Sequence, residues 1–304
     1  MKKVGLLGLG NKPESVLRFM KKSKIIDLVG IYEPNAGRIN SIAENLKINL
    51  TTNPFGLIAQ SDLLIIPKVD ENSYNLIIES ILNSKHVVIE NPLALTVKEL
   101  EELIKLSSEA SVSIVPFLPY RFNNCLLNTR FYVFNPLFIE TSCTYAPKAK
   151  ISNYEKSENL LNLIDIILNL VKANVKRIQA NSARITGNLP QLISCRIEFD
   201  NGCIACLLIK YISRRDELFC TIYQSEQIID IDLIKNCSTI KTFSKDDIMK
   251  FEVRKPPITA SLNIYESIIS YLETFEINQS QINLMETFKN SIDTLKKVED
   301  KIAH

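Results

Sequence analysis

The sequence is poor in residues on which common protein chemistries depend. Histidine occurs only twice in 304 residues, as His86 and His304, which excludes most histidine-based catalysis. The seven cysteines are an odd number in apolar or strand-like contexts, as expected of reduced thiols. Cys203 and Cys206 would lie on opposite faces of a strand, and no second pair or nearby histidine completes a zinc site. We therefore expect no bound metal.

Long apolar runs and an excess of charge are also missing. The run from Leu160 to Val171 is interrupted by Asn162, Asp165 and Asn169, so no segment offers the ~20 apolar residues that cross a bilayer. The N-terminus enters a short strand at once, without the pattern of a signal peptide, so we expect a cytoplasmic protein. The net charge is only +2 with interspersed signs, which argues against a nucleic-acid partner.

What the chain does contain is enough apolar surface for a sizeable core. Hydrophobic residues make up 46% and charged residues 23% of the sequence, which is typical of a globular protein with one large or two moderate domains.

Strand-like and helical patterns alternate over residues 1–118. This order predicts a doubly wound parallel sheet of the Rossmann type with right-handed crossovers. Thr96 and Glu99 form a capping-box pattern at the start of one helix. The predicted strands are 2–8, 25–33, 62–67, 85–90 and 111–118, and the predicted helices are 13–22, 36–46, 72–84 and 96–110.

The first strand-to-helix turn reads Gly8-Leu9-Gly10-Asn11-Lys12-Pro13. In a Rossmann sheet this turn directs main-chain N–H groups at a dinucleotide pyrophosphate, so Gly8, Gly10, Asn11 and Lys12 are candidate cofactor-binding residues. The third glycine of the usual pattern is replaced by Pro13, and a plain structural turn is the alternative.

Glu33 ends the second predicted strand, where a carboxylate accepts hydrogen bonds from the adenine ribose and repels a 2′-phosphate. This position favours NAD over NADP. The alternative is a solvated carboxylate at the end of a strand.

The pattern changes after residue 118 to longer alternating strands, which predict a second domain over 119–304. It would hold a large, mostly antiparallel sheet with a hairpin turn at 200–202. The predicted strands are 137–146, 175–185, 191–200, 203–212, 218–234 and 238–243, and the helices predicted to cover one face are 158–172, 263–275 and 280–302.

The phrase "KHVVIENPLALT", residues 85–96, resembles the "GKHVxxEKPxAxT" motif of the Gfo/Idh/MocA family of sugar oxidoreductases. Residues 119–123, 198–211 and 263–275 also resemble segments of this family, so the resemblance covers essentially the whole chain. It implies a Rossmann domain that binds a nicotinamide dinucleotide, with Glu90 and Pro92 beside the cofactor, and a homodimer or homotetramer formed through the sheet of the second domain.

Two motif positions depart from the family pattern. The family places a catalytic Lys at the position of Asn91, and a catalytic His at the position of Asn162 in a helix that also carries Glu158 and Asp165. Glu158, Asn162 and Asp165 share one helix face by their spacing. An ordinary amphipathic helix with a polar edge is the alternative. Asparagine forms hydrogen bonds but transfers no proton near neutral pH.

Other side chains are candidates for the missing acid or for substrate binding. Tyr120, Tyr145, Lys148 and Asp165 are candidate proton donors. Arg121 is a candidate clamp for an anionic or polyhydroxyl substrate, with a surface salt bridge as the alternative. Glu158 and Tyr145 are further candidate substrate contacts.

Two functions remain open from the sequence. The first is an NAD-dependent oxidoreductase that acts on a sugar, a sugar nucleotide or a related carbonyl compound. The second is a regulator or accessory subunit that binds a dinucleotide or a sugar without turnover. Loss of both Lys and His lowers acid–base assistance, which contributes roughly 10²- to 10⁴-fold, without preventing hydride transfer.

Overall fold

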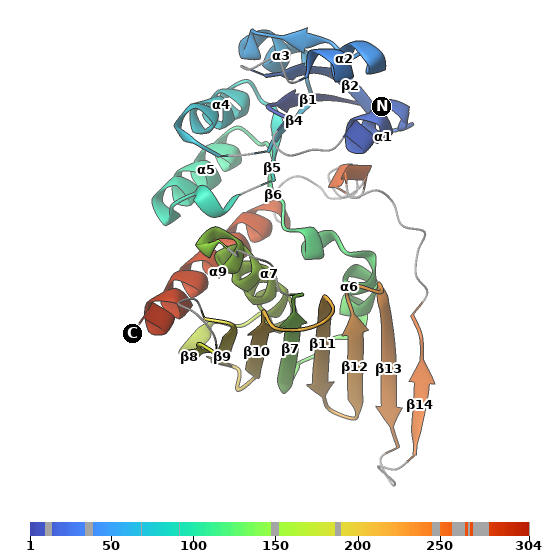
Figure 1. Ribbon diagram of the computed structural model, residues 1–304, viewed down its shortest axis with the longest axis vertical. Coiled ribbons are helices and arrows are strands. Elements are labelled where there is room, and N and C mark those ends of the chain that lie inside the picture. The colour runs from blue at the N-terminus through green and yellow to red at the C-terminus, as the bar shows by residue number, and fades with distance from the viewer. Residues whose placement is uncertain are drawn as a thin grey trace. The chain divides into compact units, whose positions relative to one another are not determined.

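The computed structural model describes residues 1–9, 14–33, 39–67, 69–90, 92–146, 152–185, 190–244, 250–256, 265–266, 268–269 and 280–303. The chain forms two compact units (Figure 1). The first contains residues 1–118 and 262–289, and the second contains 119–261 and 290–304. None of the helices within the described ranges is long and apolar enough to cross a membrane.

A six-stranded parallel sheet forms the centre of the first unit, which confirms the predicted Rossmann fold. The strand order is β3-β2-β1-β4-β5-β6, so the order reverses direction between β1 and β4. The inner strands β1, β4 and β5 end in runs of buried apolar residues, as expected of a sheet covered on both faces. The strands are β1 (Lys2–Leu7), β2 (Ile26–Tyr32), β3 (Leu50–Thr51), β4 (Leu63–Ile66), β5 (His86–Ile89) and β6 (Ile114–Pro116).

Helices lie on both faces of this sheet. Figure 1 shows α4 and α5 on one side and α1 on the other. The predicted capping box is confirmed, because the Thr96 hydroxyl accepts from the Glu99 N–H and the Glu99 carboxylate accepts from the Thr96 N–H. The helices are α1 (Glu14–Lys22), α2 (Asn40–Leu46), α3 (Pro54–Gln60), α4 (Glu71–Leu82) and α5 (Val97–Glu109).

Two elements of this unit were not expected from the sequence, β3 and α3. The helix does carry local signals, since the Asn53 side chain caps it and Pro54 occupies its first position. The strand is only two residues long and has no pattern of its own.

An eight-stranded sheet forms the second unit, with order β14-β13-β12-β11-β7-β10-β9-β8. All its pairings are antiparallel except β7 with β10, which confirms the predicted mostly antiparallel sheet. The hairpin at 200–202 is also confirmed, with Gly202 at a φ of +86° between β9 and β10. The strands are β7 (Phe138–Thr144), β8 (Val175–Ala183), β9 (Leu192–Phe199), β10 (Ile204–Lys210), β11 (Glu217–Gln224), β12 (Gln227–Asp232), β13 (Cys237–Phe243) and β14 (Phe251–Arg254).

One face of this sheet carries α7 (Asn153–Val171) and the C-terminal part of α9 (Ser280–Ala303), as Figure 1 shows. The sequence predicted a start near residue 158 for α7, but the helix begins five residues earlier, where Ser152 caps it by accepting from the Glu155 N–H. Its residues from Leu160 to Leu168 are all buried, so the helix lies inside the unit and does not have the exposed polar edge of an amphipathic surface helix.

The opposite face of the sheet carries partly exposed residues of mixed polarity. Ile204 pairs with Phe138 across β10 and β7, and Phe219 of β11 pairs with Ser142. Phe219 is 39% exposed. The homo-oligomer predicted from the sequence would form through this open face.

Gly5 in β1 is the position where the first sheet is packed most closely. A Cβ atom on Gly5 would lie 2.5 Å from Ser61 Oγ and 3.1 Å from Leu57 Cγ, whereas a Cβ on Gly56 in α3 would meet nothing closer than Asn53 Nδ2 at 3.4 Å. We expect Gly5→Ala to lower the free energy of unfolding by about 1–3 kcal/mol. Gly56→Ala, the matched control, should raise it by about 0.5–1 kcal/mol, because alanine favours a helix. Urea unfolding followed by circular dichroism measures both, and equal effects would contradict the packing argument.

Candidate functional site

The first candidate region lies where β1 and β2 end. Gly8 follows β1 with a φ of +103°, a conformation that glycine adopts without strain, and its N–H donates to the Tyr32 carbonyl oxygen at 2.8 Å. The next N–H, that of Leu9, donates to Glu33 Oε2 at 3.0 Å. The turn after β1 and the carboxylate after β2 are therefore in direct contact. Gly10, Asn11 and Lys12 lie outside the described residues.

This arrangement suits a dinucleotide. Main-chain N–H groups after the first strand bind pyrophosphate, and a carboxylate after the second binds ribose hydroxyls. Gly8 adopts a left-handed conformation in which a residue with a Cβ would be strained. Glu33 also stabilises the turn, because its carboxylate already accepts from Leu9.

The end of β5 is the second candidate region. Glu90 follows β5, its N–H donates to the Ile66 carbonyl oxygen at 2.9 Å, and its carboxylate accepts from the Tyr265 hydroxyl at 2.6 Å. Pro92 is buried and opens a short 3₁₀ turn, Pro92–Ala94. Asn91, between Glu90 and Pro92, lies outside the described residues. Tyr265 was not foreseen as part of this region.

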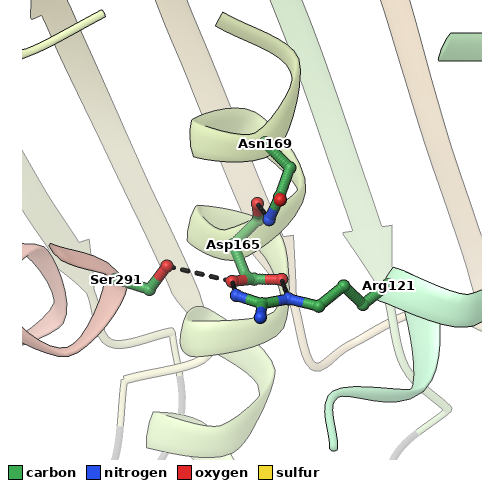
Figure 2. Close-up of polar contacts among 4 residues, drawn as sticks. All are labelled: Arg121, Asp165, Asn169 and Ser291. Atoms are coloured by element: carbon green, nitrogen blue, oxygen red, sulfur yellow. Dashed lines mark hydrogen bonds and ion pairs between the residues drawn. The ribbon is translucent and has the colours of Figure 1, made fainter. Parts of the chain in front are cut away.

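A buried ion pair occupies the interior of the second unit (Figure 2). Arg121 comes from the 3₁₀ turn Pro119–Phe122 and is 7% exposed, and Asp165 of α7 is 1% exposed. Arg121 Nε donates to Asp165 Oδ2 at 2.9 Å and Nη2 donates to Oδ1 at 2.5 Å, a bidentate pair. Ser291 Oγ of α9 donates to Asp165 Oδ1 at 3.0 Å.

This geometry changes what the two residues can do. The Arg121 guanidinium, predicted to bind a substrate, is directed at Asp165 instead. The alternative prediction of a surface salt bridge is also wrong, because both side chains are buried. The Asp165 carboxylate, a candidate acid, accepts three hydrogen bonds from Arg121 and Ser291. Both residues therefore fix the fold around α7.

Asn162 lies one turn before Asp165 on the same helix. It is 8% exposed, and its Oδ1 is the one buried side-chain oxygen or nitrogen without a hydrogen-bond partner among the residues that the structure describes. An unpaired buried amide oxygen costs about 1–3 kcal/mol, so it is well suited to accept from a ligand. Glu158, one turn earlier, is half-buried, and burial raises the pKa of its carboxyl, with a smaller contribution from Glu155.

The candidate tyrosines belong to a cluster in the second unit. Tyr145 stacks on Tyr211 with ring centroids 5.4 Å apart. Burial raises the pKa of Tyr145, raises the pKa of Tyr120, and raises the pKa of Cys143 to about 11. All three groups remain protonated at neutral pH, and each tyrosine is a weaker acid than tyrosine in water. Lys148 lies outside the described residues.

Sequence reasoning did not identify three members of this cluster. Asn159 Nδ2 donates to the Tyr211 hydroxyl at 3.3 Å, and Lys156 Nζ lies 5.8 Å from the Tyr211 ring centroid while it donates to the Pro190 carbonyl oxygen. Burial lowers the pKa of Lys156. The pairing of β7 with β10, which brings Tyr145 and Tyr211 together, has no sequence signal, although the three-residue spacing of Lys156 and Asn159 places them on one helix face.

No group of three or more potential metal ligands occurs in the described part of the chain. All seven cysteines are free. Cys203 is buried and Cys206 is partly exposed.

Residues of the first unit match one protein-family model. Residues 2–116 match the model of the GFO_IDH_MocA family, described as an oxidoreductase family with an NAD-binding Rossmann fold. No curated protein matches the sequence.

Solved structures share the fold over the whole chain. UDP-N-acetylglucosamine 3-dehydrogenase GnnA from Acidithiobacillus ferrooxidans is 16% identical, with a TM-score of 0.81, 99% of this chain covered and 97% of that one. A dehydrogenase (MviM) from Clostridium difficile is 19% identical, with a TM-score of 0.79 and 99% of each chain covered. An NAD-binding oxidoreductase from Klebsiella pneumoniae is 13% identical, with a TM-score of 0.79, 99% of this chain covered and 96% of that one. At these identities the likeness shows the fold.

The Arg121–Asp165 pair should be essential for stability. Asp165→Asn leaves the buried guanidinium without a charged partner, so we expect the free energy of unfolding to fall by about 3–5 kcal/mol. The double variant Arg121→Met with Asp165→Leu removes both charges, so its free energy of unfolding should fall by less than that of the single variant. Urea unfolding of the three proteins measures the difference. A single variant as stable as the wild-type protein would contradict the role given to this pair.

Proposed function

We propose that the chain is an NAD-dependent oxidoreductase acting on a sugar, a sugar nucleotide or a related carbonyl compound, because residues 2–116 match the model of an oxidoreductase family with an NAD-binding Rossmann fold. The observation that carries the proposal is the contact between the turn after β1 and Glu33, because it brings the glycine turn and a carboxylate together at the edge of the sheet where dinucleotides bind. The similar structure named as a UDP-N-acetylglucosamine dehydrogenase supports the choice of substrate class.

The residues of the first unit fit the cofactor. Gly8 gives the turn after β1 its left-handed conformation, and Glu33, directly after β2, accepts from the ribose of the adenosine half. Glu90 and Pro92 follow β5 at the same edge of the parallel sheet. A bound nicotinamide dinucleotide supplies the hydride chemistry, and the chain supplies binding and orientation.

In the second unit, Asn162 and Glu158 are the proposed substrate contacts. The Oδ1 of Asn162 accepts a hydrogen bond from a ligand hydroxyl, and Glu158, whose pKa is raised by burial, is the adjacent titratable group. Neither Asn91 nor Asn162 moves a proton, so a catalytic cycle relies on another group or on water. We also propose that the chain forms a homodimer or homotetramer through the open face of the second sheet.

A second candidate function is a dinucleotide- or sugar-binding regulator without turnover. The described candidate acids support this function. Asp165 forms an ion pair with Arg121, and the pKa values of Tyr120 and Tyr145 are raised. Binding and turnover therefore have to be measured separately.

Cofactor preference tests the role of Glu33. We expect the wild-type protein to bind NAD(H) more tightly than NADP(H) in calorimetric titrations. Glu33→Gln keeps an acceptor for Leu9 but removes the charge that repels a 2′-phosphate, so the preference should shrink by roughly 10-fold. Asp27→Asn removes a charge from the same strand, β2, and should leave the preference unchanged. Binding of neither dinucleotide by the wild-type protein would overturn the proposed enzyme.

Restoring the family residues tests whether a dehydrogenase site is present. Asn91→Lys combined with Asn162→His should raise NAD reduction with sugars or sugar nucleotides by roughly 10²-fold or more, the usual contribution of acid–base assistance. Asn159→His adds a histidine to the same helix outside the motif and should bring no gain. Nicotinamide absorbance at 340 nm reports turnover. If the double variant binds NAD but stays inactive on every substrate, the regulator becomes the better explanation.

A further inference from the structure

Residues 265–269 belong to the first unit although 143 residues of the second unit, 119–261, precede them in the chain. Ile268 and Ile269 are 1% and 2% exposed, and Tyr265 is 9% exposed. Glu266 accepts from Ser23 Oγ at 2.7 Å, which ties the segment to the loop between α1 and β2. The segment is therefore an integral part of the dinucleotide-binding unit.

Tyr265 contacts the ends of two neighbouring strands. Its hydroxyl donates to Glu90 Oε1 at 2.6 Å, just after β5, and its ring stacks on Phe117, just after β6, with ring centroids 6.4 Å apart and planes within 9°. Burial is the main cause that raises the pKa of Tyr265, and the Glu90 charge adds to it. The hydroxyl thus remains a neutral donor, and the stacked ring fixes its direction.

The hydrogen bond is charge-assisted, and its geometry restrains the Glu90 side chain. Glutamate has several rotatable bonds, and an unrestrained carboxylate samples a number of rotamers. Glu90 lies in the motif that the family resemblance places beside the cofactor. A carboxylate held in one position offers a preorganised acceptor there, which lowers the entropic cost of binding.

We propose that Tyr265 is a positioning residue of the dinucleotide site, which holds the Glu90 carboxylate in its binding-competent orientation. The inference rests on the proposed function and extends it, since it makes a residue from the C-terminal part of the chain a determinant of cofactor affinity.

The test compares dinucleotide affinity with stability in the full-length protein. Tyr265→Phe keeps the stacked ring and removes only the hydroxyl. If Glu90 is then distributed over several rotamers, the competent fraction falls and the dissociation constant for NADH should rise by roughly 3- to 10-fold. Calorimetric titration measures the affinity, and thermal unfolding measures the stability.

Glu266→Gln is the matched control, because it weakens a different polar contact of the same segment, the one with Ser23, and leaves the Tyr265–Glu90 bond in place. We expect it to lower the melting temperature by an amount similar to Tyr265→Phe and to leave the dissociation constant within twofold of wild type. If both variants weaken NADH binding in proportion to their loss of stability, Tyr265 only docks the segment and the inference is wrong.

A double-mutant cycle with Glu90→Gln tests whether Tyr265 acts through Glu90. Glu90→Gln alone should weaken binding, and Tyr265→Phe should add less than twofold in that background. Undiminished effects of Tyr265→Phe in the Glu90→Gln background would overturn the inference, and so would wild-type affinity in Tyr265→Phe. Should Tyr265→Phe fail to fold, wild-type affinity in Glu90→Gln alone would overturn it. Failure of the wild-type protein to bind either dinucleotide would instead remove the proposed function on which the inference rests.

Discussion

The Asp165 carboxylate imposes the strongest local constraint on the second unit. A buried carboxylate is tolerated only when charge and hydrogen bonds replace its lost hydration. Here the partners come from two segments that are distant in sequence from α7, the turn at Arg121 and Ser291 of α9. Satisfying one carboxylate therefore fixes the turn and both helices together. The proposed substrate contact Asn162 is positioned one turn away on the helix that this arrangement holds.

The first unit depends on a different constraint, the common direction of its strands. Gly8, Glu33, Glu90 and Phe117 each lie within one residue of the end of a parallel strand, so they gather at one edge although 109 positions separate the first from the last. The side chains at this edge also support one another. The Glu33 carboxylate accepts a hydrogen bond from the Leu9 N–H, and the Tyr265 hydroxyl donates one to Glu90. The proposed cofactor region thus consists of mutually oriented groups as well as a glycine turn.

Much of this architecture could be predicted because its signals are local. Alternating strands and helices, the capping box at Thr96 and the hairpin at Gly202 are set by residues within a few positions of one another. The candidate site was less predictable. Arg121 was considered as a substrate clamp, yet its partner lies 44 positions away, and no local pattern marks that distance. The short strand β3 was not predicted, because two residues show no periodicity. The pairing of β7 with β10, which brings Tyr145 and Tyr211 together, was not predictable either, because it depends on the arrangement of the whole sheet.

The sequence by itself determined the two sheets and the glycine turn followed by a carboxylate, since residue type and spacing are enough for each. Tertiary structure alone decided which polar side chains have hydrogen-bond partners. It directed Arg121 at Asp165, left Asn162 Oδ1 without a partner among the described residues, and brought Tyr265 to Glu90 across 175 positions. The physical reason is that hydrogen-bond partners and burial depend on contacts between distant segments, and these exist only once the chain has folded.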